Sequence, residues 1–359
     1  MKIFRNILLM ATMALVIVAC DRGIDPISKV EPGPDEEPPV VNLNYPTDGT
    51  AIRVKEDITS IDIKFEVRDD IEIQSIVIEL NGSQIAELTE FKDYRRVVET
   101  VTYDQVTNGE HTLTLTATDM SGKSTSKSVD FEKIAPYETQ YDGEIFYMPF
   151  DASFMELVSI TNATEEGSPG FAEGKTNQAY APAPDSYVTF PTATFAAGDA
   201  LTTDEFSATF WYNMNTSKTR AGILVIGPPG DNDRTNGFRL FREGDETNQN
   251  VTLNVGNGDS DSWFGGPSLS SDAGWVHVAV TISSDQAAVY FDGNVEVEGD
   301  FPGPIGWEGC DILSIGSGAP RFIGWNHLSD VGSLYDELRI YNKALSQEEI
   351  QTIMDETKK

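Results

Sequence analysis

The sequence predicts an all-β protein built from two domains, and three observations support this. Short runs alternate between apolar and polar residues, as in 61–67 and 76–80, which is the pattern of a strand with one buried face. Turn-forming pairs such as Asn81-Gly82 separate these runs. The chain has 359 residues, which is enough for two ordinary domains, and no extended helical period occurs before its tail.

Residues 40–134 are predicted to form the first domain. An alternating run at 40–45 ends at the turn signal Pro46-Thr-Asp-Gly49, and further strands follow about every ten residues, which favours a β-sandwich. The run from Gly109 to Asp119, with His111 and alternating Leu and Thr, resembles bacterial immunoglobulin-like domains. The resemblance implies an immunoglobulin-like spacer in which His111 is structural.

Residues 138–359 are predicted to form a second, larger all-β domain. Strand-like runs recur through it, at 187–190, 206–214, 222–226, 237–241, 251–255, 275–282, 287–291, 312–315 and 334–341. The last run is followed by Ser346-Gln-Glu-Glu349, a capping box that predicts a short terminal helix.

Several segments of this domain occur in the order of a known family. The closing stretch 335–350, Tyr-Asp-Glu-Leu-Arg-Ile-Tyr-Asn-Lys-Ala-Leu-Ser-Gln-Glu-Glu-Ile, resembles the C-terminal signature of laminin-G-like domains. Residues 206–211 (Phe-Ser-Ala-Thr-Phe-Trp) and 274–281 (Gly-Trp-Val-His-Val-Ala-Val-Thr) are similar to inner strands of that family. The resemblance implies a concanavalin A-like jelly-roll sandwich with a short C-terminal helix.

The N-terminus carries the pattern of an export signal. Residues 1–19 combine Lys2 and Arg5 with an apolar run too short to span a membrane, which predicts a cleaved signal peptide. The run ends at Cys20 and resembles a lipobox, which implies a lipid anchor on Cys20; the alternative is a plain secretory signal. Residues 20–39 are rich in Pro and acidic residues and predict a flexible tether. The resemblance is to Bacteroidetes lipoproteins and implies an outer-membrane protein facing the exterior.

The formal net charge of −33 limits the partners that we expect. Nucleic acid would be repelled, so a nucleic-acid partner is not expected. The same charge favours solubility and makes binding of a divalent cation plausible.

The family resemblance also implies one structural Ca²⁺. Members often hold it with an Asp after the first strand, an Asp before the last strand and loop carbonyls. The matching positions are Asp151 and Asp336. Carboxylate and carbonyl oxygens suit Ca²⁺, which accepts six to eight of them. The alternative is a pair of solvated turn aspartates.

No catalytic signature stands out, so we expect a protein without enzymatic activity. Glycosidases need two carboxylates across the scissile bond, and neither Glu243-Gly-Asp245-Glu246 nor Glu296-Val-Glu298 matches a jelly-roll pattern. There is no Gly-x-Ser-x-Gly, and the chain contains three histidines.

Three tryptophans fall in segments rich in Gly and Pro, where no strand pattern predicts their burial. They are Trp263, Trp307 and Trp325. An indole in a loop can form a flat platform for the apolar face of a sugar ring. Arg239 could add hydrogen bonds or pair with an acidic sugar. The alternative is that the tryptophans anchor their loops and that the arginine is a solvated strand charge.

These expectations combine into one functional hypothesis. The protein is expected to bind polysaccharide or oligosaccharide at the cell surface without catalysis, and to supply it to glycan-uptake machinery. Two alternatives remain open, a protein-binding adhesion module and a divergent polysaccharide lyase or glycosidase. Because the last step rests on fold-level analogy and on loop tryptophans, the sugar stays unnamed.

Overall fold

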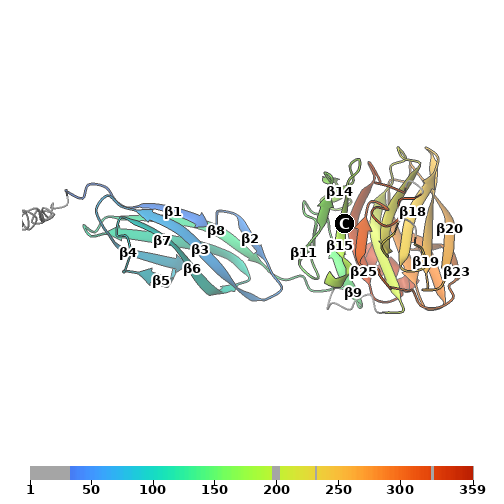
Figure 1. Ribbon diagram of the computed structural model, residues 1–359, viewed down its shortest axis with the longest axis horizontal. Helices are drawn as coiled ribbons and strands as arrows, with labels where there is room; N and C mark the ends of the chain where they lie inside the picture. The colour runs from blue at the N-terminus through green and yellow to red at the C-terminus, as the bar shows by residue number, and fades with distance from the viewer. Residues whose placement is uncertain (1–32, 196–202, 231–232, 325–326, 359) are drawn as a thin grey trace, which may run out of the picture. The chain divides into compact units, whose positions relative to one another are not determined.

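The computed structural model describes residues 33–195, 203–230, 233–324 and 327–358. The chain divides into two compact units. The first contains Ile58–Lys133 and the described residues up to Ile52, and the second contains Ile134–Lys359 with the short segment Arg53–Asp57. The regular secondary structure of the described part is almost entirely β-strand, which confirms the predicted fold class (Figure 1).

The first domain is a sandwich of two antiparallel sheets with the strand orders β1-β3-β6 and β2-β8-β7-β4-β5. Its strands are β1 (Val40–Tyr45), β2 (Thr50–Arg53), β3 (Ile58–Arg68), β4 (Ile73–Leu80), β5 (Ser83–Leu88), β6 (Arg96–Thr107), β7 (Gly109–Asp119) and β8 (Ser124–Ile134).

Alternation along the strands places one face of each sheet in the core of this domain. Ile63 and Phe65 of β3 and Ile76 and Ile78 of β4 have no exposed surface. Asn81 and Gly82, which join β4 to β5, both have positive φ, as a tight hairpin turn requires.

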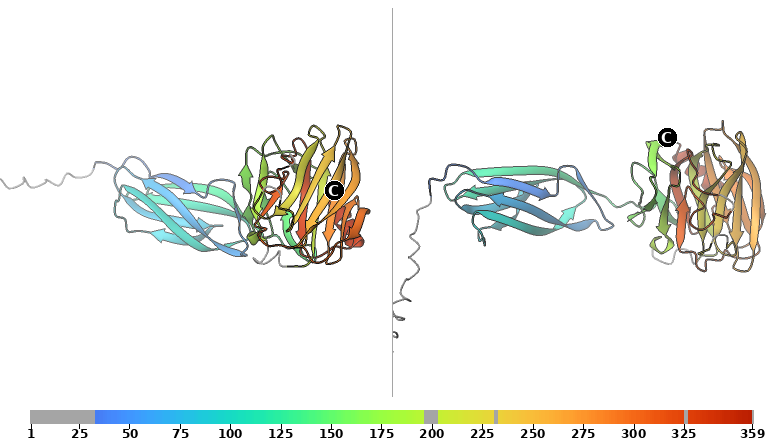
Figure 2. Two further views of the ribbon diagram at one scale, coloured as in Figure 1. Left: turned by 45° about the vertical axis from the view of Figure 1, so that its right-hand side comes forward. Right: turned by 45° about the horizontal axis from the view of Figure 1, so that its top comes forward.

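The second domain is a larger sandwich, shown from two further directions in Figure 2. One sheet has seven strands in the order β12-β15-β24-β17-β18-β19-β20. The other has the order β13-β14-β25-β16-β21-β22-β23, and β9 also pairs with β25. The elements are β9 (Glu144–Met148), β10 (Met155–Glu156), β11 (Thr161–Asn162), β12 (Thr164–Glu166), β13 (Gly170–Glu173), β14 (Gln178–Ala181), β15 (Tyr187–Pro191), η1 (Thr192–Thr194), β16 (Phe206–Asn213), β17 (Arg220–Gly227), β18 (Phe238–Gly244), β19 (Asn248–Gly256), β20 (Asp261–Ser270), β21 (Trp275–Ile282), β22 (Gln286–Phe291), β23 (Asn294–Asp300), β24 (Ile312–Ile315), β25 (Leu334–Tyr341) and α2 (Gln347–Glu356).

The inner faces of these two sheets form one hydrophobic core. It includes Phe210 from β16, Leu240 from β18 and Leu253 from β19, all without exposed surface. We call the opposite side of the seven-stranded sheet its outer face. Side chains on that face point away from the core, and this is where polar and aromatic groups can meet a ligand.

The tail helix α2 begins as the sequence predicts. Ser346 accepts a hydrogen bond from the backbone N–H of Glu349, and the Glu349 side chain accepts from the backbone N–H of Ser346, so the capping box is complete. Ile350 and Ile353 of the helix pack with Tyr341 and Ala279 in a separate buried cluster. The helix therefore covers part of the outer side of the eight-stranded sheet.

The segment around Trp263 differs from the expectation. It was predicted to be a loop, but Asp261–Ser270 forms the edge strand β20. Its pairing with β19 shifts register between Asn250 and Thr252, opposite Gly265-Gly266-Pro267. Such an irregularity accommodates Gly and Pro at a sheet edge, and that composition concealed the strand in the sequence.

Candidate functional site: an exposed tryptophan on the outer face and a two-aspartate loop

Trp263 projects from the edge strand β20 onto the outer face of the seven-stranded sheet. The next residue, Phe264, is buried in the core, so the period-two alternation turns Trp263 away from it. The Trp263 side chain is 50% exposed. Among the described residues of the second domain, it is the only aromatic side chain with this degree of exposure.

Two neighbours contact the Trp263 ring, and a third residue holds one of them. The ring of Phe241 meets it edge-on, with centroids 5.9 Å apart. The Arg234 guanidinium lies 5.5 Å from the ring centroid, and its Nε donates to Asp261 Oδ2 at 3.2 Å. A partly exposed indole is thus fixed beside a charged donor and a carboxylate, which is an arrangement that can bind a flat polar ligand.

Arg239 does not lie on the surface, which corrects the expectation that it could contact a ligand. It pairs in register with Asn254, which pairs with Trp263, but neither Arg239 nor Asn254 has exposed surface. Arg239 donates to the backbone carbonyls of Asp233 and Arg234. Burial lowers the pKa of its guanidinium to about 10. The residue therefore supports the Asp233–Arg234 loop from beneath.

A segment that we call the strap, residues 317–329 without 325 and 326, covers another part of the outer face. Phe322 from the strap packs with Val225 and Phe241 of the sheet. His327 stacks on Phe322 at 4.8 Å and meets Phe241 at 4.4 Å. A side chain at Gly222 would collide with the strap backbone at Ser317 and Gly318, so the strap lies directly on the sheet. Trp325 lies outside the described residues.

Trp307 anchors its loop, which is the alternative to the predicted sugar platform. It is half-buried and packs against the main core, with its ring 5.7 Å from Phe206. Its Nε1 donates to the backbone carbonyl of Thr203 at 3.0 Å. Because its polar atom is already bonded within the protein, Trp307 does not resemble an open platform.

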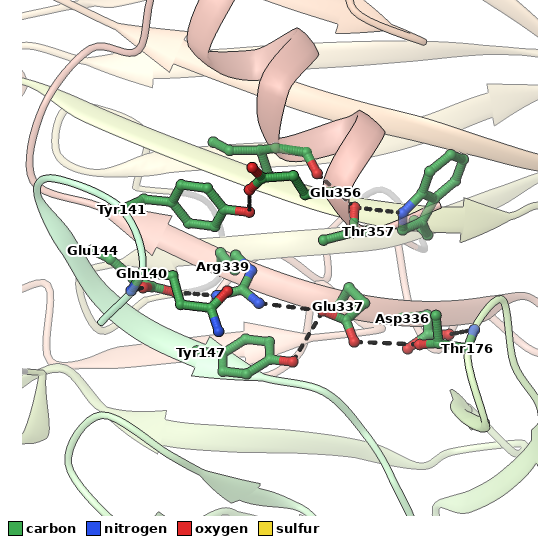
Figure 3. Close-up of polar contacts among 12 residues, drawn as sticks. Gln140, Tyr141, Glu144, Tyr147, Thr176, Asp336, Glu337, Arg339, Glu356 and Thr357 are labelled. Carbon is green, nitrogen blue, oxygen red and sulfur yellow. Dashed lines mark hydrogen bonds and ion pairs between the residues drawn. The ribbon is translucent and has the colours of Figure 1, made fainter. Parts of the chain in front are cut away.

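Asp151 and Asp336 both contact one short loop, residues 174–178. Asp336 Oδ2 accepts from the backbone N–H groups of Lys175 and Thr176 at 2.7 and 2.9 Å. Asp151 accepts from the Asn177 side chain and from the Gln178 N–H, each at 3.2 Å. The first part of the domain and its closing strand therefore meet at this loop. Figure 3 shows the contact of Asp336 with Thr176.

The second carboxylate oxygen of Asp336, Oδ1, is suited to coordinate a cation. Asp336 has no exposed surface, and its Oδ1 has no hydrogen-bond partner among the described residues. Burial raises the pKa of its carboxyl to about 7, and the neighbouring Glu337 carboxylate adds to this effect. Among the described residues, no three His, Cys, Asp or Glu side chains cluster as a metal site, so loop carbonyls would have to complete the shell.

Next to this site, a buried ion pair explains the charged residues of the closing strand. Arg339 pairs with Glu144, and its guanidinium lies 3.6 Å from the Tyr147 ring centroid. Glu337 accepts from the Tyr147 hydroxyl at 3.0 Å and from Arg339 at 3.4 Å (Figure 3). These contacts join β25 to β9 and serve the fold.

Comparison with known protein families agrees with both domains. Residues 39–115 match the bacterial Ig domain family, and residues 182–351 match a family described as the concanavalin A-like lectin/glucanases superfamily. The chain carries a bacterial Ig domain followed by a concanavalin A-like domain. No curated protein matches this sequence.

Two solved structures that are similar to this chain have low sequence identity to it and TM-scores below 0.5. Domain 4 of an extracellular arabinanase from Geobacillus stearothermophilus, in complex with arabinotriose, is 17% identical with a TM-score of 0.43 and covers 59% of this chain and 98% of that one. The binding domain of botulinum neurotoxin DC in complex with SialylT is 12% identical with a TM-score of 0.44. The match covers 60% of this chain and 52% of that one. This chain spans about half the length of the second structure.

The candidate catalytic groups of the concanavalin A-like domain are spread over both sheets, apart from His327 and Glu243, whose Nε2 and Oε2 atoms lie 3.7 Å apart. His277 and His327 are 1% and 3% exposed. Glu296 and Glu298 lie on β23, at an edge of the eight-stranded sheet, while Glu243 lies on the other sheet. A general base at either histidine would not reach a surface substrate without rearrangement.

The two cysteines of the chain differ in what the structure describes of them. Cys20, the expected lipidation site, is outside the described residues. Within the described residues, no helix is long and apolar enough to cross a membrane. Cys310 is buried in the concanavalin A-like domain, and burial raises the pKa of its thiol.

Proposed function

We propose that the concanavalin A-like domain binds carbohydrate, without catalysis, at Trp263 on the outer face of its seven-stranded sheet. The observation that supports this proposal most is the half-exposed indole, fixed by Phe241 and flanked by Arg234 and Asp261. The apolar face of a sugar ring would cover the exposed indole, and its hydroxyls would bond the flanking polar groups.

Affinity electrophoresis in gels containing polysaccharides tests this directly. Wild-type protein should be retarded by the glycan that it binds, and Trp263→Ala should remove most of the retardation. Trp307→Phe is the matched control, since it keeps an aromatic ring in the core and should leave retardation unchanged. If Trp263→Ala migrates like wild type in every retarding gel, the platform is not at Trp263.

We propose further that Asp151, Asp336 and carbonyls of the loop at 174–178 hold a structural Ca²⁺. Both carboxylates contact this loop, and Asp336 Oδ1 is a buried acceptor without a described partner. Bound Ca²⁺ would supply the positive charge that this carboxylate lacks and would tie the start of the domain to β25.

The setting that we propose is a lipid anchor on Cys20 that holds the protein at the outer membrane, facing outward. There it would present glycan to uptake machinery. The support is the sequence pattern of residues 1–39. Metabolic labelling with an alkyne fatty acid tests the anchor, and Cys20→Ala should remove the label. Digestion of intact cells with protease tests exposure, since an inward-facing protein would survive it.

A further inference from the structure

The concanavalin A-like domain has a second feature on the same side as Trp263, a pocket of 440 Å³. Three segments line it: residues 184–185, residues 218–220, and residues 328, 329 and 331. The strap supplies one wall through Leu328, which is 43% exposed. Pro184 and Val331 add further apolar surface. An exposed apolar wall within a concave site is typical of ligand pockets.

The lining of this pocket is richer in cationic side chains than the chain as a whole. Lys218 and Arg220 line it together with a single described acidic residue, Asp185. In the whole chain, by contrast, 58 acidic residues outnumber 25 basic ones. Because Glu243 already pairs with Arg220, the Lys218 ammonium is the cation that attracts an anionic group to this pocket.

Buried groups hold the backbone at Lys218, and an exposed ion pair holds the Arg220 side chain. The backbone carbonyl of Lys218 accepts from Arg242 Nη1 at 2.9 Å and from Gln249 Nε2 at 2.8 Å, and neither donor residue has exposed surface. Arg220 lies 3.4 Å from Glu243 on the neighbouring strand β18. Within the described residues, the Lys218 ammonium forms no ion pair. Its charge is therefore held at the pocket by a rigid backbone and has no described counter-ion.

A continuous series of contacts joins this pocket to Trp263. Trp263 meets Phe241, Phe241 meets His327 of the strap, and His327 Nε2 lies 3.7 Å from Glu243, which pairs with Arg220. Trp263 and Arg220 are three strands apart and offset by four residues along β18, which places their backbones roughly 20 Å apart. The two sites are thus spaced for different residues of one oligosaccharide.

We infer that the pocket at Lys218 and Arg220 binds the carboxylate of an acidic sugar, in the same glycan that stacks another residue on Trp263. This inference rests on the proposed glycan binding and names its chemical class: an oligosaccharide that carries a uronic acid. The ammonium and guanidinium pair with the carboxylate, and Leu328 and Pro184 contact the apolar face of the ring.

Two-dimensional NMR of the full mature chain tests the two sites separately. Methyl glucuronoside and methyl glucoside are the probes, because they differ in the carboxylate. The glucuronoside should shift the backbone amides of Thr219 and Arg220, whereas the glucoside should not. Both probes should shift the Trp263 indole N–H. Added salt should weaken the glucuronoside shifts at the pocket.

Lys218→Met is the decisive variant, since it removes the charge and keeps the apolar stem of an exposed side chain. It should weaken glucuronoside binding at the pocket about fivefold, which is about 1 kcal/mol. The indole shifts should stay as in wild type. Lys127→Met, at an exposed lysine of the first domain, is the matched control and should change neither.

Results that differ from these expectations distinguish a failure of the pocket from a failure of the platform. If the glucuronoside moves the indole but not the amides of Thr219 and Arg220, the acidic pocket is wrong and the platform stands. Amide shifts that persist unchanged in Lys218→Met would also overturn the assignment of the pocket. If neither probe moves the Trp263 indole and no polysaccharide gel retards the wild-type protein, the proposed function fails, and the two-point binding of one glycan fails with it.

Discussion

Arg242 and Asp330 form an ion pair in which neither side chain has exposed surface. The same carboxylate accepts from the hydroxyls of Tyr212, Tyr335 and Ser333 at 2.6, 2.5 and 2.7 Å. Buried charges persist in proteins when they are paired and hydrogen-bonded in this way. The pair connects β18 with the residues between the strap and β25, so it holds the strap in place.

We predict that Asp330→Asn strongly destabilises the second domain. It leaves the Arg242 guanidinium buried without a counter-charge, which should lower the free energy of unfolding by about 3–5 kcal/mol. Urea denaturation of wild type and variant measures this. The exposed pair of Arg220 and Glu243 is the control, and Glu243→Gln should cost less than about 1 kcal/mol. Equal losses for the two variants would contradict the special role of burial.

Substitutions of Trp307 and Trp263 should affect different properties. Trp307→Ala removes a ring that packs on the core and a hydrogen bond to Thr203, so we expect a loss of about 2–3 kcal/mol in stability. Trp263→Ala removes a half-exposed ring and should cost about 1 kcal/mol or less. Thermal melts of both variants decide this. If Trp263→Ala proved the more destabilising, the indole would be a packing residue instead of a platform.

Acidification should destabilise the domain through His277. Burial against Trp211 lowers the pKa of this histidine to about 3, whereas an unfolded histidine titrates near 6.5. Below pH 6.5 the unfolded chain binds a proton that the folded one excludes, so stability is lost as the pH falls toward 3. The expected contribution is about 1.4 kcal/mol per pH unit between roughly 6 and 4.

Replacing His277 by a residue that does not titrate separates its contribution to the pH dependence of stability from that of the many carboxylates. His277→Gln should have a shallower dependence of unfolding free energy on pH than wild type over that window. Chemical denaturation at several pH values gives both slopes. Parallel slopes would mean that His277 is protonated in the folded state.

Chelation should lower the thermal stability of the second domain. If Ca²⁺ at a hundred times its Kd stabilises the fold by about 2.7 kcal/mol, removing it should lower the Tm by about 5–10 °C. Asp336→Asn should remove the difference between Ca²⁺ and chelator. Calorimetry in Ca²⁺, Mg²⁺ and chelator measures it. Identical melts in all three solutions would refute the Ca²⁺ proposal.

The fold could be predicted from the sequence because the signals that specify it are local. Alternation in β3 and β4, the Asn81-Gly82 turn and the capping box at Ser346 each depend on neighbouring residues, and the structure has all of them. The site could not be predicted as well. Trp263 was singled out, but Arg234, which lies over its ring, was missed because the two residues are 29 positions apart.

Arg239 and Trp307 show why the local pattern misleads at the site. An arginine in an alternating strand normally faces solvent, but here the loop at Asp233 and Arg234 covers it. Trp307 lies in a loop rich in Gly and Pro, yet its indole bonds to Thr203. In both cases, burial comes from a segment that the sequence does not place next to the residue.

The sequence by itself determined the class of the fold, the order of the two domains, and the strand and capped helix that close the chain. These follow from hydrophobic periodicity and turn chemistry, which act over a few residues. Only the tertiary structure decided that Asp151 and Asp336 contact one loop, that Trp263 stays exposed, and that Lys218 and Arg220 line a pocket. Each of these depends on contacts between segments far apart in the chain, and packing of the sandwich sets them.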